Sequence, residues 1–190
     1  MSARHSVLPL LLLIALAVHG GEVWTGTSDV KFRGYSTLHD FDGTVRAVPL
    51  NVNVRQAANG RIVDATSDVK VKEMNTADEK RDANMMTMFK EAKFHLIKVE
   101  VSGAEERMLR PPSGKPGTMP VTLTISGTRG TANGAVTNVS ESAAKVEFDL
   151  AFPVSLKAFN LEPPKVIGGV IKVRDNVDVT AHVVLKKAAE

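Results

Sequence analysis

The sequence predicts an all-β fold with a helical insertion, in which about eight antiparallel strands form a sandwich or a closed barrel. Three observations lead to this prediction. Apolar and polar residues alternate with a period of two from Trp24 onward, turn-forming residues separate these runs, and only the stretch 76–93 has helical spacing. Each strand then has one dry and one wet face, and closure into a barrel is favoured because it removes exposed sheet edges.

Residues 1–20 differ from the rest of the chain. Arg4 precedes an almost continuous apolar run over residues 7–16, and small residues follow before residue 21. An apolar run of about ten residues is too short to span a bilayer as a permanent helix, whereas this layout is typical of a secretory signal peptide. We therefore expect a cleaved signal peptide at 1–20, a single domain at 21–190 and a periplasmic or secreted location. An N-terminal anchor or a buried strand is the alternative.

The strand predictions rest on apolar residues that alternate with charged residues or threonine. In chain order these apolar residues are Val30 and Phe32; Val69 and Val71; Ile97, Val99 and Val101; Val121, Leu123 and Ile125; Val146, Phe148, Leu150 and Phe152; and Val177, Val179, Ala181, Val183 and Leu185. Candidate tight turns lie between or beside them, because Gly, Asn and Asp tolerate positive φ. These candidates are Asp42-Gly43, Asn59-Gly60, Asn133-Gly134 and residues 174–176.

The segment 76–93 breaks the period-two pattern. Thr76 and Glu79 fit a capping box, and acidic residues occupy the first turn, where the helix dipole favours them. Met85, Met88 and Phe89 then recur at helical spacing, and good helix formers continue to residue 93. We expect one helix or a helical pair that plugs an end of the barrel. Methionine also suits an apolar surface that adapts to an irregular ligand, and spacing alone does not separate these two uses.

Composition and motifs exclude several classes of function. The chain has no cysteine, which removes disulfides, thiolate catalysis and cysteine-based zinc sites. His39, His95 and His182 lack metal-binding spacing. The net charge of +3 comes from interleaved acids and bases, so no nucleic-acid surface is expected. Aromatic residues make up only 5% of the chain, too few for the girdles of a transmembrane barrel.

No nucleophile elbow and no phosphate-binding loop occurs in the sequence. Carboxylates in the predicted helix leave a hydrolase-like enzyme as a remote alternative, although a solvated helix face explains them better. We therefore predict no catalytic residues, no metal and no cofactor.

Five motifs occur in order along the chain. They are residues 36–44 (STLHDFDGT), 75–85 (NTADEKRDANM), 92–99 (AKFHLIKV), 122–130 (TLTISGTRG) and the closing strands at 152–156 and 173–185. Together they resemble the YceI-like, polyisoprenoid-binding family over roughly residues 30–186. The chain resembles a divergent member, because Phe94-His95 replaces the usual aromatic–proline pair and Asn84 replaces a histidine.

The resemblance implies an exported, eight-stranded, lipocalin-like barrel that sequesters or carries a long-chain isoprenoid or similar apolar ligand in its lumen. Burial of the tail would supply the affinity, since each methylene contributes ~0.8 kcal/mol. Arg81 is a candidate for the ligand's head group or for a salt bridge to Asp82 or another acid. The candidate lumen residues are Phe32, Val45, Val69, Val71, Met85, Met88, Phe89, Ile97, Val99, Leu123, Ile125, Phe148, Leu150, Phe152, Val177 and Val179.

The expected partner is thus an apolar lipid, with an isoprenoid lipid or a quinone both compatible with the site. We expect no nucleic-acid partner and no membrane span after cleavage, and a homodimer is left open. The alternative function is a packed periplasmic β-domain without ligand, which would act through its outer surface as a structural or protein-interaction module.

Overall fold

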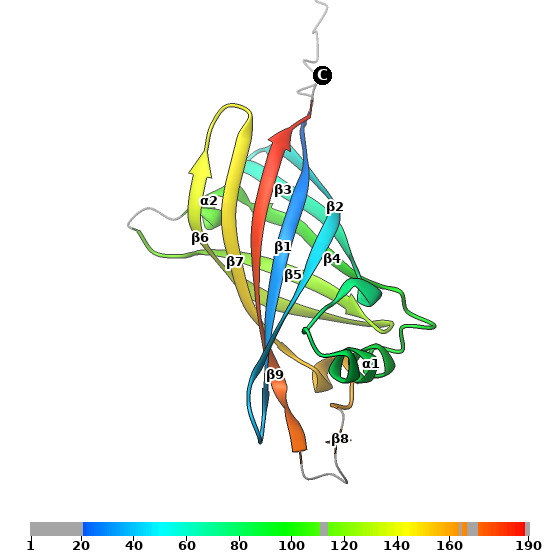
Figure 1. Ribbon diagram of the computed structural model, residues 1–190. Coiled ribbons are helices and arrows are strands. Elements are labelled where there is room, and N and C mark those ends of the chain that lie inside the picture. The colour runs from blue at the N-terminus through cyan, green and yellow to red at the C-terminus, as the bar shows by residue number, and fades with distance from the viewer. Residues whose placement is uncertain (1–20, 111–113, 164, 167–170, 189–190) are drawn as a thin grey trace, which may run out of the picture.

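The computed structural model describes residues 21–110, 114–163, 165–166 and 171–188 of the chain. The predicted signal peptide at residues 1–20 lies outside this part. Within it, antiparallel strands wind into an elongated barrel. Helix α1 (Glu79–Met88) lies at one end of the barrel and helix α2 (Glu106–Leu109) lies toward the other (Figure 1).

Eight long strands form the barrel, and their spatial order follows their order along the chain. They are β1 (Glu22–Ser36), β2 (Phe41–Ala57), β3 (Gly60–Lys70), β4 (Leu96–Glu105), β5 (Gly117–Ile125), β6 (Thr128–Glu141), β7 (Lys145–Ser155) and β9 (Ile171–Lys187). The two-residue β8 (Lys165–Val166) pairs with β9 beyond the barrel. Two short 3-10 helices, η1 (Val71–Glu73) and η2 (Lys157–Phe159), follow β3 and β7.

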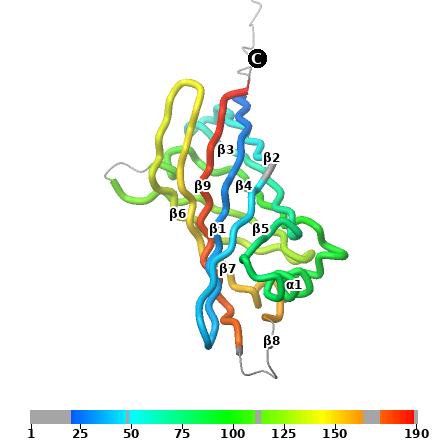
Figure 2. Tube along the Cα trace, in the orientation of Figure 1, coloured from blue at the N-terminus to red at the C-terminus, as the bar shows by residue number. Residues whose placement is uncertain are grey.

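The barrel closes between its first and last strands. β1 pairs antiparallel with β2 along one edge and with β9 along the other. The β1–β9 pairing extends from Trp24↔Lys187 to Ser36↔Val173, so the two strands lie side by side for most of their length (Figure 2). The prediction of a closed, eight-stranded antiparallel barrel is therefore confirmed over a two-sheet sandwich.

The seam between β4 and β5 is the shortest strand pairing within the barrel. These strands share three paired positions, Lys98↔Thr124, Val99↔Leu123 and Glu100↔Thr122. Farther along, α2 packs against β3, β4 and β5. Gly117 permits this approach, because a Cβ at that position would overlap the backbone of Leu109.

Only one of the four candidate tight turns forms a turn between strands. Asn59-Gly60 is at the β2–β3 turn as expected, but Asp42-Gly43, Asn133-Gly134 and residues 174–176 lie inside β2, β6 and β9. The β5–β6 turn is made by Ser126-Gly127, and both residues have positive φ, 48° and 81°.

The helical insertion also differs from its prediction. The N-cap of α1 is Asp78, whose carboxylate accepts a hydrogen bond from the Arg81 N–H at 2.9 Å. Thr76 is not the cap; its N–H and Oγ1 both donate to Asp82, at 3.0 and 2.6 Å. The helix ends at Met88 rather than continuing to residue 93, because the chain turns at Lys90, where φ is 55°.

Candidate functional site

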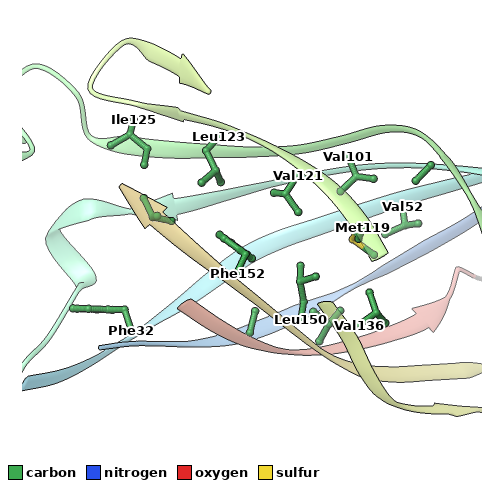
Figure 3. Close-up of a cluster of buried hydrophobic side chains, with 14 of the residues drawn as sticks. Phe32, Val52, Val101, Met119, Val121, Leu123, Ile125, Val136, Leu150 and Phe152 are labelled. Atoms are coloured by element: carbon green, nitrogen blue, oxygen red, sulfur yellow. The ribbon is translucent and has the colours of Figure 1, made fainter. Parts of the chain in front are cut away.

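A cavity of about 320 Å³ occupies the interior of the barrel. This volume is at the lower end of the range for small-molecule sites. All eight barrel strands contribute side chains to its wall, and α1 and α2 contribute at the two ends. Figure 3 shows side chains from separate strands converging on this space, among them Val52, Met119, Val136 and Leu150.

The wall is apolar because the strands alternate. Along β5, Val121, Leu123 and Ile125 are buried and line the cavity, whereas the intervening Thr122 and Thr124 are only half-buried. Since successive side chains of a strand point to opposite faces, this pattern places apolar groups inside and polar groups outside. The chemistry of the lumen thus follows directly from period-two patterning.

All but one of the predicted lumen residues line the cavity. They are Phe32, Val45, Val69, Met85, Met88, Phe89, Ile97, Val99, Leu123, Ile125, Phe148, Leu150, Phe152, Val177 and Val179. Val71 is the exception: it is only 1% exposed but does not line the cavity. The reason is that β3 ends at Lys70, so the alternation no longer applies one residue later in η1.

Other cavity-lining residues were missed by the sequence reading. Val52 and Val54 of β2 alternate with Asn51 and Asn53, a signal that could have found them. Others could not be recognised because their strands are rich in small residues. In β6, for example, Gly, Ala and Thr leave little alternation of apolar and polar side chains. The main residues missed are Trp24, Ala47, Val63, Ala65, Met119 and Val136. The alternation had already identified Val121, Ala181, Val183 and Leu185 as apolar strand residues, and they line the cavity as well.

Arg81 lies at the α1 end of the cavity, where it is 27% exposed. Its Nη1 donates to the carbonyl of Thr76 at 3.3 Å, and its guanidinium lies 4.8 Å from the centre of the Phe41 ring. Its Nη2 is 3.6 Å from a carboxylate oxygen of Asp78. Arg81 therefore pairs with Asp78 rather than with Asp82, which is occupied by Thr76.

The opposite end of the cavity carries a charged collar, made of Glu22, Arg61, Glu106, Arg110 and Glu141. Arg61 lies between two carboxylates, 2.8 Å from Glu22 and 3.4 Å from Glu106, and Arg110 pairs with Glu141. Burial alone would raise the pKa of Glu22, but Arg61, the Trp24 indole N–H and Lys187 together hold it below its ordinary value. All five collar residues line the lumen, and all but Glu22 also border a separate outer recess.

Two buried serines interrupt the apolar wall between these ends. Ser28 of β1 is 5% exposed and Ser67 of β3 is 8% exposed, and both line the cavity. The Oγ of Ser67 has no hydrogen-bond partner in the described part of the chain. The sequence reading did not single out either serine.

The histidines considered as metal ligands lie apart on the outer surface. His95 is 3.1 Å from Glu91 and His182 is 2.8 Å from Asp149, whereas His39 is in the exposed β1–β2 connection. Among the described residues, no cluster of three or more His, Asp or Glu side chains could hold a metal ion. No helix in the same residues is both long enough and apolar enough to cross a membrane.

Solved structures with the same fold come from several bacteria. BcnA of Burkholderia cenocepacia is 19% identical with a TM-score of 0.63, over 83% of this chain and 95% of that one. A polyisoprenoid-binding domain from Saccharophagus degradans is 16% identical with a TM-score of 0.60, over 87% and 98%. The YceI protein of Campylobacter jejuni is 17% identical with a TM-score of 0.51, over 78% and 85%. At these identities the likeness establishes the fold.

A search of curated proteins finds no match to the chain. The sequence profile of the YceI-like domain, in contrast, matches residues 22–185, which is nearly all of the barrel from β1 to β9. The chain therefore belongs to the YceI-like domain family.

Proposed function

We propose that this protein is an exported lipid-binding protein that sequesters or carries a long-chain isoprenoid or similar apolar ligand in its lumen. The observation that carries the proposal is the predominantly apolar wall of the cavity, to which all eight barrel strands contribute. Charged side chains border the cavity at its two ends, as Arg81 at one and the collar at the other. The middle of the lumen thus suits a hydrocarbon tail.

Burial of such a tail supplies enough free energy without specialised polar contacts. At ~0.8 kcal/mol per methylene, a few isoprene units already bring micromolar affinity within reach. The structural likeness to a polyisoprenoid-binding domain supports an isoprenoid as the ligand class. The methionines and Phe89 at the α1 end would cover one end of the tail, since flexible Met side chains adapt to irregular apolar surfaces.

The location follows from residues 1–20, whose basic start, short apolar run and small residues are those of a signal peptide. We propose that the barrel works in the periplasm or outside the cell, after cleavage. No catalytic step is part of the proposal. Asp78 and Asp82, two of the acids in the helical insertion, both accept hydrogen bonds that shape α1.

The decisive test is mass spectrometry of the protein purified from its own host, under native and denaturing conditions, with organic extraction of bound lipid. We expect about one apolar lipid per chain, lost on denaturation. A ligand-free mass, with no uptake of added polyprenols or quinones, would instead favour a packed module that acts through its outer surface.

A pair of variants ties the bound lipid to the lumen. Ala181 is buried on the cavity wall, and its neighbour Thr180 on β9 is exposed. Ala181→Phe fills the cavity and should abolish lipid uptake, whereas Thr180→Phe should bind normally. Circular dichroism of both variants confirms that the barrel is intact. Equal lipid content in the two variants would place the ligand elsewhere.

A further inference from the structure

Ser67 is an unusual residue for the wall it occupies. Its inward neighbours along β3 are Ala65 and Val69, and its cross-strand partners are Leu50 on β2 and Val99 on β4. All four are apolar. The Ser67 hydroxyl therefore lies in an apolar setting, and its Oγ is buried without a partner among the described residues.

Such a hydroxyl destabilises the ligand-free barrel, because an unpaired buried polar group loses its hydrogen bonds to water. Alanine or valine would keep the alternation of β3 and avoid this loss. Buried polar groups in folded proteins almost always have a partner, so a single orphan beside a cavity indicates a partner that enters the cavity.

Ser28 provides a second hydroxyl on the same wall. It pairs across the sheet with Ala47 on β2, and Ser67 pairs with Leu50, also on β2. The register of β2 shifts between Ala47 and Leu50, so the two serines flank a local irregularity. Irregularities of this kind bend a strand and alter the direction of nearby side chains. The wall thus has two separate hydroxyls, one on each side of β2, and of these only the Ser67 Oγ is fully buried without a partner among the described residues.

Ser67 lies far from the charged collar. At about 3.3 Å of rise per residue, Ser67 is about 20 Å along β3 from Arg61. A ligand held at Ser67 would extend its tail through the apolar part of the lumen toward the collar. The basic groups at the two ends are already paired, Arg61 and Arg110 with glutamates and Arg81 with Asp78.

We infer that Ser67 is the polar anchor of the lumen and hydrogen-bonds an uncharged oxygen of the bound lipid. The inference rests on the proposed lipid-binding function and adds to it a residue that selects the ligand. The ligand class is an isoprenoid with an alcohol or carbonyl oxygen. A charged oxygen at this depth would lack a counter-ion, and burial of an unpaired charge is far costlier than burial of a hydroxyl.

Three probes with one tail test the anchor: geranylgeraniol, the hydrocarbon of the same skeleton, and geranylgeranyl phosphate. Trp24 reports binding, because it is the only tryptophan of the chain and lines the cavity. Fluorescence titrations compare the delipidated wild-type protein with Ser67→Ala. Ser140→Ala, on the exposed outer part of β6, is the control.

In the wild-type protein and in Ser140→Ala, we expect the alcohol to bind about five- to tenfold tighter than the hydrocarbon, the effect of one neutral hydrogen bond. Ser67→Ala should remove this difference by weakening alcohol binding while leaving hydrocarbon binding unchanged. It should also raise the melting temperature of the ligand-free barrel, a readout that does not depend on any probe.

Two results would overturn the anchor while leaving lipid binding intact: equal affinity of the wild-type protein for alcohol and hydrocarbon, or equal weakening of both by Ser67→Ala. The first would mean that water alone satisfies Ser67. Tighter binding of the phosphate than of the alcohol would overturn the uncharged ligand class. Failure of every probe to bind would overturn the proposed function and the anchor with it.

Discussion

The ring of Phe32 on β1 lies directly against Gly43, its cross-strand partner on β2. A Cβ on Gly43 would overlap the far edge of this ring. The same arrangement recurs where Leu150 of β7 covers Gly134 of β6. In both places a large lumen side chain occupies the space that a neighbouring side chain would fill. The glycines therefore set how far these side chains lean within the lumen.

Gly43→Ala should destabilise the barrel by about 1–3 kcal/mol, because the added methyl group forces the Phe32 ring out of its place. Urea unfolding measures this loss. In Phe32→Leu, which lacks the ring, the same glycine substitution should cost much less. Equal losses in the two backgrounds would show that the ring is not what restricts residue 43.

Asp82→Ala should lower the free energy of unfolding by about 1–3 kcal/mol, since it leaves the N–H and hydroxyl of the buried Thr76 without an acceptor. Glu79→Ala should change stability by only a few tenths, because Glu79 is exposed and does not complete a capping box. Chemical denaturation of the two variants measures both losses. A larger loss in Glu79→Ala than in Asp82→Ala would indicate that Thr76 is the N-cap after all.

Gly117→Ala should loosen α2 from β5, because a methyl group there overlaps the backbone of Leu109. We expect faster amide hydrogen exchange in α2 and β4 near the short seam, together with a loss of about 1–3 kcal/mol in stability. Thr118→Ala, one residue along on the exposed face, is the matched control. Unchanged exchange in Gly117→Ala would mean that α2 moves aside without cost.

Stability should fall at acid pH in part through Asp64. Its carboxylate accepts a hydrogen bond from the Gly103 N–H at 2.7 Å and another from Arg55 at 3.2 Å, and these hold its pKa below the ordinary value of 3.8. A lowered folded-state pKa means that the stabilisation is fully present above 3.8 and is lost as the pH falls through the folded-state pKa.

Asp64→Asn should therefore be less stable than the wild type at about pH 6, and the gap should narrow toward about pH 2. Urea midpoints across that range measure it. A gap that stays constant with pH would assign the loss to the shape of the amide rather than to the charge. The comparison variant is Asp29→Asn. Asp29 forms an exposed ion pair with Arg46 on the outside of β2.

The fold and most of the lumen could be predicted because alternation is a local signal that directly reflects burial. The turns at Asp42-Gly43 and Asn133-Gly134 could not be judged in this way. Both pairs look like turns because glycine tolerates positive φ, but here the glycines are in strands to make room for Phe32 and Leu150. The need for this space comes from side chains on neighbouring strands, so the local sequence around each glycine does not reveal it.

The charged collar could not be predicted from the sequence for a related reason. Glu22, Arg61 and Glu106 come from three separate elements, and only the successive pairing of β1 to β4 brings them together. Arg81 was recognised, but its partner was not, because the choice between Asp78 and Asp82 depends on where α1 begins. Ser67 has an ordinary sequence context, and its significance appears only when its hydroxyl is seen to lack a partner.

The pairing of β1 with β9 also bears on the order of folding. Neighbouring strands elsewhere in the barrel are joined by short or moderate connections, but this pairing joins the first and last strands of the barrel, which lie farthest apart in the sequence. Contacts of such long sequence separation form late, because the entropy lost on closing the loop must be overcome first. Until then the sheet is an open trough with its apolar face accessible along one side. A lipid present during folding would therefore contact the open sheet before the barrel closes. The pairing of β9 with β1 would then enclose the lipid in the lumen.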